Sequence, residues 1–253
     1  MPAPRNDVKA ALAAGQLQRG LWLNLDSPVT AEIAGRAGFD WCLIDGEHGP
    51  WDPTGIRAQL IALEGTGTTA VLRVPVAQDW ILKQALDLGV QTVLVPMVDS
   101  VAEAEAVVRA CRYPPEGVRG MGAAVARAAA YGNTADYAAT ANEEICILVQ
   151  AESRAAMADL AAIAAVDGVD GVFIGPADLG ADMGYRDALD APELWDEVER
   201  GIAIIRDAGK AAGIIVFGEE AEARMIDCGV TFLGVGSDAA LLAAALKKVA
   251  APA

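Results

Sequence analysis

The sequence predicts a (β/α)8 TIM barrel, a fold of the α/β class, formed as one domain by residues 1–253. Short runs rich in Val, Ile and Leu alternate with longer Ala-rich amphipathic stretches, which is typical of parallel βαβ units. Eight such runs can be counted, and eight strands close a barrel. No stretch reads as a linker, and barrels of about 250 residues form a single unit. An open doubly wound sheet is the alternative, since strand order cannot be read from sequence.

The eight predicted strands are separated by segments long enough for a helix. In chain order they are Gly20–Leu25, Trp41–Asp45, Thr69–Arg73, Thr92–Pro96, Ile145–Gln150, Gly171–Ile174, Gly213–Phe217 and Phe232–Val235.

The predicted helices carry start and stop signals. A capping residue followed by proline marks three starts, at Ser27-Pro28, Asp52-Pro53 and, more loosely, Ala191-Pro192. Glycines that can adopt the left-handed conformation follow apolar helical runs and precede strands, at Gly38, Gly89, Gly168, Gly209 and Gly229.

The segment Arg112–Asn133 is too long for an ordinary helix–strand connection. Its large side chains, including Tyr113, Met121 and Tyr131, favour a packed loop over a disordered insertion. We expect this loop to cover the functional site.

The composition excludes several classes of partner. The net charge of −16 would repel phosphate backbones and anionic lipid surfaces, so neither nucleic acid nor a membrane is expected. A small anionic substrate would therefore need a local positive site.

The sequence carries no sign of export or of membrane insertion. The four cysteines lack Cys-x-x-Cys spacing, the first fifteen residues lack the apolar core of a signal peptide, and no apolar stretch approaches eighteen residues. These features predict a cytoplasmic protein with reduced thiols.

Polar residues follow several predicted strands at the end where barrel enzymes place their active sites. His48, the only histidine, comes just after Asp45 at the end of the second strand. A lone histidine is often a core residue, but this position and the nearby carboxylates favour a catalytic role. Arg73 ends the third strand, where it can form a buried ion pair, stabilise a developing oxyanion, or do both.

Glu152 and Asp178 follow the fifth and sixth strands, with Gln150 nearby. Such oxygen ligands suit a hard divalent cation that keeps several waters. The alternative is that both carboxylates cap the helices that follow them. The turn Gly175-Pro176-Ala177-Asp178 offers free backbone N–H groups to a carboxylate, whereas Gly234–Ser237 is only a weak phosphate-binding signal.

The lysines argue against Schiff-base chemistry. All five, Lys9, Lys83, Lys210, Lys247 and Lys248, fall in predicted helices or before strands rather than at strand ends. A carbonyl substrate would then have to be polarised by a metal ion.

Several motifs together resemble the HpcH/HpaI family of class II pyruvate-dependent aldolases, over about residues 20–246. The most specific are Gly38-Phe39-Asp40-Trp41 leading to Ile44–His48, Leu94–Val98, Arg112–Gly117 with Arg119-Gly120, and Gly171–Leu179. The resemblance implies reversible aldol cleavage or addition of 4-hydroxy-2-oxo acids, through the enolate of pyruvate or a related 2-oxo acid, with an aldehyde acceptor.

The resemblance also implies residue roles. Glu152 and Asp178 would bind Mg2+ or Mn2+, with Co2+, Ni2+ or Zn2+ as further candidates, and Arg73 would hold the keto oxygen. His48, supported by Asp45, would move the proton, directly or through a metal-bound water. The amides of Ala177 and Asp178 would receive the substrate carboxylate, and Trp22 and Phe217 would line the donor pocket. Gln150, Gly175 and Pro176 complete the expected substrate-binding set.

The family pairs its histidine with an aspartate that matches Asp87, which lies near the end of a predicted helix at the opposite barrel face. We expect Asp87 to act from a neighbouring subunit of a homo-oligomer, a trimer or hexamer. Ala151, Ser153 and the pair Phe217-Gly218 depart from the family pattern, which favours a larger donor such as hydroxypyruvate. Rival functions are a decarboxylase of oxaloacetate-type 2-oxo acids and a 2-oxo acid binding protein without turnover.

Overall fold

A computed structural model of the chain, which describes residues 1–251, confirms the predicted barrel. Eight parallel strands close in chain order, and β1 pairs with both β2 and β8, which rules out an open sheet. The strands are β1 (Gln18–Leu23), β2 (Trp41–Asp45), β3 (Thr69–Arg73), β4 (Thr92–Val95), β5 (Cys146–Ala151), β6 (Gly171–Ile174), β7 (Ala211–Ile215) and β8 (Phe232–Ser237).

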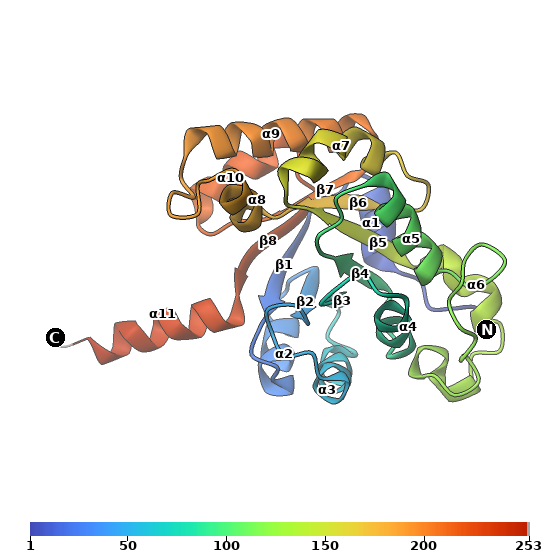
Figure 1. Cartoon of the computed structure of the whole chain (residues 1–253). Helices are drawn as coiled ribbons and strands as arrows, with labels where there is room; N and C mark the ends of the chain where they lie inside the picture. Colours follow the sequence, from blue (N-terminus) through green and yellow to red (C-terminus); the bar gives the residue numbers. More distant parts are fainter. Residues whose placement is uncertain (252–253) are drawn as a thin grey trace.

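Helices surround the strands (Figure 1). They are α1 (Asp7–Ala13), α2 (Pro28–Gly35), α3 (Pro53–Leu63), α4 (Asp79–Asp87), α5 (Val101–Cys111), η1, a 3-10 helix (Arg127–Gly132), α6 (Tyr137–Glu144), α7 (Arg154–Ala164), α8 (Pro176–Asp182), α9 (Pro192–Asp207), α10 (Glu219–Cys228) and α11 (Asp238–Ala250).

All three predicted helix starts are confirmed, but only two of them carry a side-chain cap. Ser27 and Asp52 accept hydrogen bonds from the first turns of α2 and α3, whereas Ala191 precedes α9 without a side-chain cap. The predicted first and seventh strands were each displaced by two residues toward the C-terminus. The ladder of β1 begins at the polar residues Gln18 and Arg19, and the apolar run of β7 continues past Ile215, so hydrophobicity alone misplaces the strand ends.

The core has two layers. Between the strands and the outer helices lies a large aliphatic cluster of Val, Ile, Leu and Ala. Inside the barrel a second cluster contains most of the buried aromatic rings, with Trp41 stacked on Phe232 at a centroid distance of 4.1 Å and Trp22 packed edge-on against Trp41. Val8 and Leu12 of α1 belong to this inner cluster, so α1 closes the barrel at the amino ends of the strands.

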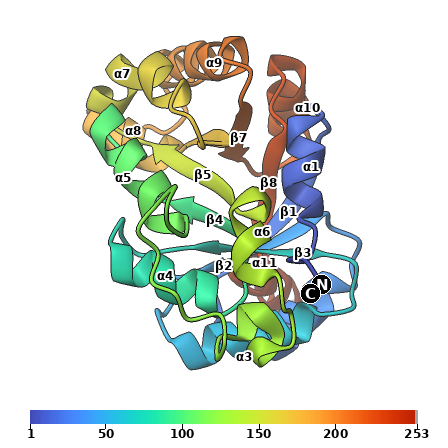
Figure 2. The same cartoon turned by 90° about the vertical axis from the view of Figure 1, so that its right-hand side faces the viewer.

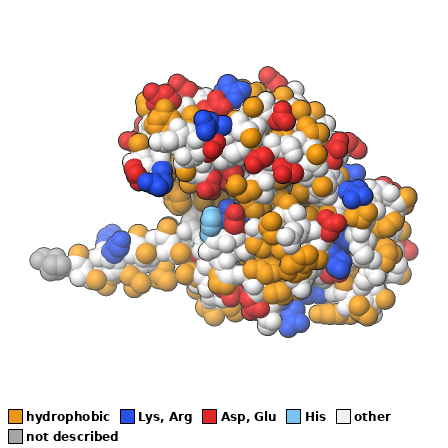
Figure 3. Space-filling model, viewed as in Figure 1, with side chains coloured by type: hydrophobic (Ala, Val, Ile, Leu, Met, Phe, Trp, Pro, Cys, Tyr) orange, Lys and Arg blue, Asp and Glu red, His pale blue; other side chains and the backbone are white. Residues whose placement is uncertain are grey.

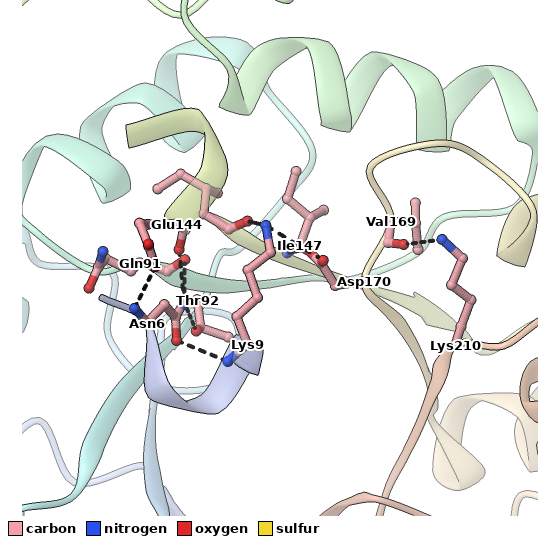
Figure 4. Close-up of polar contacts among 10 residues, drawn as sticks. Asn6, Lys9, Gln91, Thr92, Glu144, Ile147, Val169, Asp170 and Lys210 are labelled. Atoms are coloured by element: carbon pink, nitrogen blue, oxygen red, sulfur yellow. Dashed lines mark hydrogen bonds and ion pairs between the residues drawn. The ribbon is translucent and has the colours of Figure 1, made fainter. Parts of the chain in front are cut away.

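Polar contacts fasten α1 at this amino end (Figure 4). The Asn6 amide donates to Thr92 Oγ1 at 3.0 Å and to the Glu144 carbonyl at 3.0 Å. Lys9 Nζ donates to the Ile145 carbonyl at 2.6 Å and lies 3.7 Å from Asp170 Oδ1. Figure 2 shows α1 and α6 on this side of the barrel.

α11 projects away from the barrel (Figure 1). Asp238 is its only buried residue, and Leu241, Leu242, Leu246 and Val249 are all exposed. The neighbouring helix α2 also exposes Val29 and Ile33. The eighth βα unit therefore leaves an apolar helix without a partner in its own chain, within the part of the chain that the structure describes.

The prediction that Arg112–Asn133 covers the functional site is wrong for its own chain. Arg127 of this segment contacts the Leu88 carbonyl at 2.9 Å and pairs with Glu64, both just after helices α4 and α3 end. Because the segment follows helix α5, which runs antiparallel to the strands, it must begin at the amino end of the barrel. Over residues 1–251, none of the helices is both long and apolar enough to cross a bilayer.

Candidate active site

Asp45 and Arg73 form a buried ion pair at the carboxyl ends of β2 and β3. The paired register sets Asp45 beside Arg73. The guanidinium contacts the carboxylate twice, Nε to Oδ1 at 2.8 Å and Nη2 to Oδ2 at 2.7 Å. The Asn24 amide donates to the same carboxylate at 2.7 Å. Arg73 is thus held in one orientation at the barrel mouth, as its position in the sequence predicted.

Glu47 is a third charged member of this group, which the sequence analysis did not single out. Its Oε2 lies 2.8 Å from Arg73 Nη1, as an ion pair without an aligned hydrogen bond. Burial raises the pKa of Glu47, the Arg73 charge opposes this shift, and Glu152 adds to it. Its place two residues after the strand-end aspartate and directly before His48 was the available signal.

Glu152 is buried directly after β5. Its Oε1 accepts a hydrogen bond of 2.8 Å from the Met97 backbone N–H, and its Oε2 accepts one of 2.5 Å from the Gln150 amide. Burial raises the pKa of Glu152, and the nearby charge of Asp178 raises it further against these two hydrogen bonds. The site therefore holds carboxylates that repel one another, which a cation would relieve.

The residues present fit a divalent cation. Gly175 approaches so closely that a Cβ on it would lie 2.4 Å from Glu152 Oε2, so the space beside this oxygen is kept free of a side chain. The buried Gln150 Oε1 has no hydrogen-bond partner in the described chain. No group of three or more His, Cys, Asp or Glu side chains able to hold a metal occurs among residues 1–251. Glu152 and Asp178 would be the protein ligands, and water and substrate would supply the remaining oxygens, as Mg2+ favours.

His48 lies exposed at this mouth. It is the only histidine of the chain, and the space-filling view shows it as a pale-blue group open to solvent with acidic and basic side chains beside it (Figure 3). Asp45 supports its backbone, because Oδ1 accepts from the N–H groups of Glu47 at 3.1 Å and His48 at 3.3 Å. The imidazole ring itself has no hydrogen bond to any residue from 1 to 251. Asp45, which was expected to support His48, accepts from its backbone N–H while its carboxylate pairs with Arg73.

The other predicted substrate-binding residues lie either inside the barrel, below Arg73, or at the edge of the barrel mouth. Trp22 is buried inside the barrel, with the Arg73 guanidinium 5.9 Å from its ring centroid, so it lies beneath the charged group. Phe217 is 61% exposed after β7. Gly175 precedes α8, and Pro176, Ala177 and Asp178 form its first turn, whose leading N–H groups have no helical partner.

Asp87 lies elsewhere in its own chain. It ends α4, so it is at the amino end of the barrel, and it pairs with Arg119 at 2.7 Å. The chain therefore does not bring its own Asp87 to its own His48, which agrees with the predicted separation of the two.

A comparison of the sequence with known families identifies this arrangement. The profile described as HpcH/HpaI aldolase/citrate lyase matches residues 18–245. The chain belongs to this family. The predicted membership is confirmed, and the HpcH/HpaI match covers every site residue discussed above.

Individual HpcH/HpaI relatives are similar along almost their full length. A hydroxypyruvate/pyruvate aldolase of Agrobacterium fabrum is 54% identical over 99% of this chain and 94% of its own. A 4-hydroxy-2-oxo-heptane-1,7-dioate aldolase of Shigella sonnei is 48% identical over 97% of this chain and 94% of its own. The crystal structure of an HpcH/HpaI aldolase/citrate lyase family protein from Burkholderia cenocepacia superposes with a TM-score of 0.92 at 36% identity, covering 96% of this chain and 97% of that one.

Proposed function

We propose that this protein is a divalent-metal-dependent aldolase that cleaves and forms 4-hydroxy-2-oxo acids, with pyruvate or hydroxypyruvate as the donor. The observation that carries the proposal is the shared barrel mouth of Arg73, Glu152 and His48 in a chain of the HpcH/HpaI family. An aldolase needs a base, a cation facing the ketone and a place for the substrate carboxylate, and each has a candidate here.

The bound cation, held by Glu152 and Asp178, would supply electrophilic polarisation of the 2-oxo group. Arg73, already fixed by Asp45, would donate to the keto oxygen as negative charge develops on it. The first turn of α8 would receive the substrate carboxylate at the N–H groups of Ala177 and Asp178. Gln150 Oε1, buried and without a partner in the described chain, would accept from a substrate hydroxyl or a water.

His48 would act as the acid–base group. In the cleavage direction its imidazole takes the proton of the 4-hydroxyl, the C3–C4 bond breaks to release the aldehyde, and the electron pair remains as the enolate. The imidazolium then returns the proton to C3, which gives the free 2-oxo acid. A base with a pKa near neutrality suits both transfers.

The donor preference rests on one support, since the Agrobacterium relative is named a hydroxypyruvate/pyruvate aldolase. Ala151 does not add to it, because its side chain packs in the aliphatic cluster between the strands and the outer helices. Ser153 contributes less than expected to this argument, since its hydroxyl caps α7 and donates to Asp99 at 2.5 Å.

We further propose that the active unit is a homo-oligomer in which Asp87 of one subunit orients His48 of the partner subunit. The ring of His48 has no hydrogen bond to a carboxylate among residues 1–251, and a catalytic base is typically oriented by a third group of this kind. The exposed apolar side chains of α11 and α2 supply surface for self-association. Trimer or hexamer, cytoplasmic location and the identity of the metal stay predictions.

An aldol assay tests the function directly. Pyruvate and hydroxypyruvate are offered with several aldehydes before chelation, after chelation and after addition of Mg2+ or Mn2+. We expect loss of activity on chelation and recovery with metal, and no recovery in His48→Ala. A matched control is Glu219→Gln, which removes an exposed carboxylate at the same end of the barrel. Full activity after rigorous chelation would refute the metal role, and wild-type rates in His48→Ala would refute the assignment of the base.

A further inference from the structure

Asp87 occupies an unfavourable position on its helix. It is the last residue of α4, where the negative end of the helix dipole disfavours a carboxylate, and the last turn of α4 contains no basic residue. Its side chain is nevertheless 28% exposed and points out of the helix toward the segment that follows α5. A carboxylate in such a place is stabilised and oriented by a cation beside it.

Arg119 is that cation, and it is buried to an unusual degree. Its side chain is 0% exposed, its Nη2 lies 2.7 Å from Asp87 Oδ1, and its guanidinium stacks 4.3 Å from the ring centroid of Tyr113. Nε and Nη1 have no hydrogen-bond partner within residues 1–251. Burying a guanidinium against one partly exposed acid is a poor way to stabilise a fold, because desolvation opposes the attraction.

The surroundings of Arg119 hold it rigidly. Its backbone N–H donates to the Arg112 carbonyl at 2.8 Å, and the preceding Val118 N–H donates to the Arg109 carbonyl at 2.8 Å. Tyr113, on which the guanidinium stacks, is fixed by Asn142, which accepts from its N–H at 2.8 Å and donates to its carbonyl at 3.1 Å. The guanidinium therefore sets the direction of the Asp87 carboxylate rather than following it.

The surface around this pair is apolar and open. Val118, Met121 and Val125 of the same segment are exposed, Met121 by 67% and Val125 by 77%. Asp87 is thus an oriented carboxylate beside an exposed apolar strip, while the ring of His48, at the other end of the barrel, has no hydrogen bond to a carboxylate among residues 1–251. A second copy of this chain would bring such a carboxylate to the His48 ring.

We propose that Arg119 is a positioning residue for catalysis, which holds Asp87 in the direction that lets it orient His48 of the partner subunit. This inference rests on the proposed function, in which Asp87 acts across the subunit interface. Arg119 touches neither the metal ligands nor the substrate, and its effect passes only through Asp87.

The first test is a comparison of single variants. We expect Arg119→Met to lower kcat by about tenfold to a hundredfold, with a small change in KM, because the metal and substrate contacts stay in place. Asp87→Asn should have a similar effect, and the double variant should be no worse than either single one. Arg127→Met is the matched control: Arg127 lies on the same segment and also contacts the end of α4, at the Leu88 carbonyl, but it does not touch Asp87. If Arg119→Met retains wild-type kcat, the inference is overturned.

The second test separates positioning from folding by mixing subunits. His48→Ala subunits, which retain Arg119 and Asp87, are co-expressed with Arg119→Met subunits, which retain His48, and mixed oligomers are isolated by two affinity tags. At random pairing about one quarter of the sites combine an intact His48 with an intact Arg119–Asp87 pair, so activity should rise well above that of either parent. Should Arg119→Met fail to fold, Arg119→Lys, which keeps the charge but not the planar fork, takes its place.

The outcomes distinguish this inference from the proposed function. Recovery with both Asp87→Asn and Arg119→Met subunits supports both. Recovery with Asp87→Asn but not with Arg119→Met or Arg119→Lys overturns the role of Arg119 and leaves the shared site standing. Absence of recovery with Asp87→Asn refutes the shared site itself, and the positioning role falls with it.

Discussion

At the amino end of the barrel, Lys9 donates to the Ile145 carbonyl and lies near Asp170, whose Oδ2 accepts from the Ile147 N–H at 2.8 Å. At the carboxyl end, Asp45, Glu47 and Glu152 crowd around the single cation Arg73. Both groups bury charge, but Lys9 and Asp170 at the amino end are satisfied by hydrogen bonds inside the chain. At the carboxyl end, buried negative charge exceeds positive charge. Gln150 Oε1, which has no hydrogen-bond partner in the described chain, lies beside these carboxylates.

This difference teaches which end is built for stability and which for binding. Polar networks that are fully satisfied make a fold rigid, whereas a partly satisfied one costs free energy that a ligand can recover. In a TIM barrel the two roles are divided in the same way, with stability at the amino end and catalysis at the carboxyl end of the strands. Substitutions at the two ends should therefore have opposite signatures.

The largest effect is expected at the carboxyl end. Glu152→Gln should lower aldolase activity by roughly 10³-fold, because the cation loses a charged ligand. The same change should leave the metal-free protein as stable as the wild type or more so, since it removes a buried carboxylate whose pKa is raised by burial. Rates with pyruvate and thermal unfolding without metal measure the two quantities. If Glu152→Gln lowered the stability of the metal-free protein as well as its activity, the proposed difference between the two ends of the barrel would be wrong.

A smaller effect is expected from Gly175→Ala. Gly175 has φ −90° and ψ 94°, which any residue can adopt, so an alanine there causes no backbone strain. Its Cβ would lie 2.4 Å from Glu152 Oε2 and displace the carboxylate. We expect metal affinity to fall by about tenfold to a hundredfold, with KM for the donor rising in parallel, as for other changes that reorient a ligand. Calorimetric titration with Mn2+ checks this, and an unchanged affinity would mean that Glu152 Oε2 is not a ligand.

Sequence alone predicted the carboxyl end better than the amino end. A strand that ends in a charged residue places that residue at the mouth, so Asp45, Arg73 and Glu152 could be found from strand positions alone. Which acid pairs with Arg73 depends on the register between β2 and β3, which the sequence does not show. For this reason Asp45 was predicted to support His48, and the pair of Glu47 with Arg73 was missed.

The amino end depends on contacts between distant segments. Asn6 and Lys9 bond to residues more than eighty positions away, and nothing in their local sequence specifies those partners. The position of Arg112–Asn133 could have been predicted, because a segment between a helix and the next strand must begin at the amino end. The projection of α11 away from the barrel could not have been predicted. An amphipathic pattern indicates that one face of a helix is buried, but not whether its own chain or another chain buries it.

The smallest effect on catalysis is expected at the amino end. Lys9→Met removes the donor to the Ile145 carbonyl and the cation nearest Asp170, so the free energy of unfolding near neutral pH should fall by about 1–2 kcal/mol. The value of kcat should stay unchanged, because Lys9 lies at the opposite end from His48. Urea denaturation measures the first and the aldol assay the second, with Arg57→Met, which removes an exposed cation on α3, as the matched control.

The pH dependence of the Lys9→Met effect tests its cause. Burial raises the pKa of Asp170, and Lys9 opposes this shift, so Lys9→Met should raise the pKa of Asp170 further. Lys9 stabilises the fold only while Asp170 is ionised. Its electrostatic contribution is therefore present above the raised native pKa of Asp170 and is lost as the pH falls through it. The difference in unfolding free energy between wild type and Lys9→Met should thus shrink in acid, leaving the contribution of the hydrogen bond to Ile145. A difference that does not vary with pH would show that this bond alone carries the stability, and the buried charges at the amino end would then contribute nothing to the contrast with the mouth.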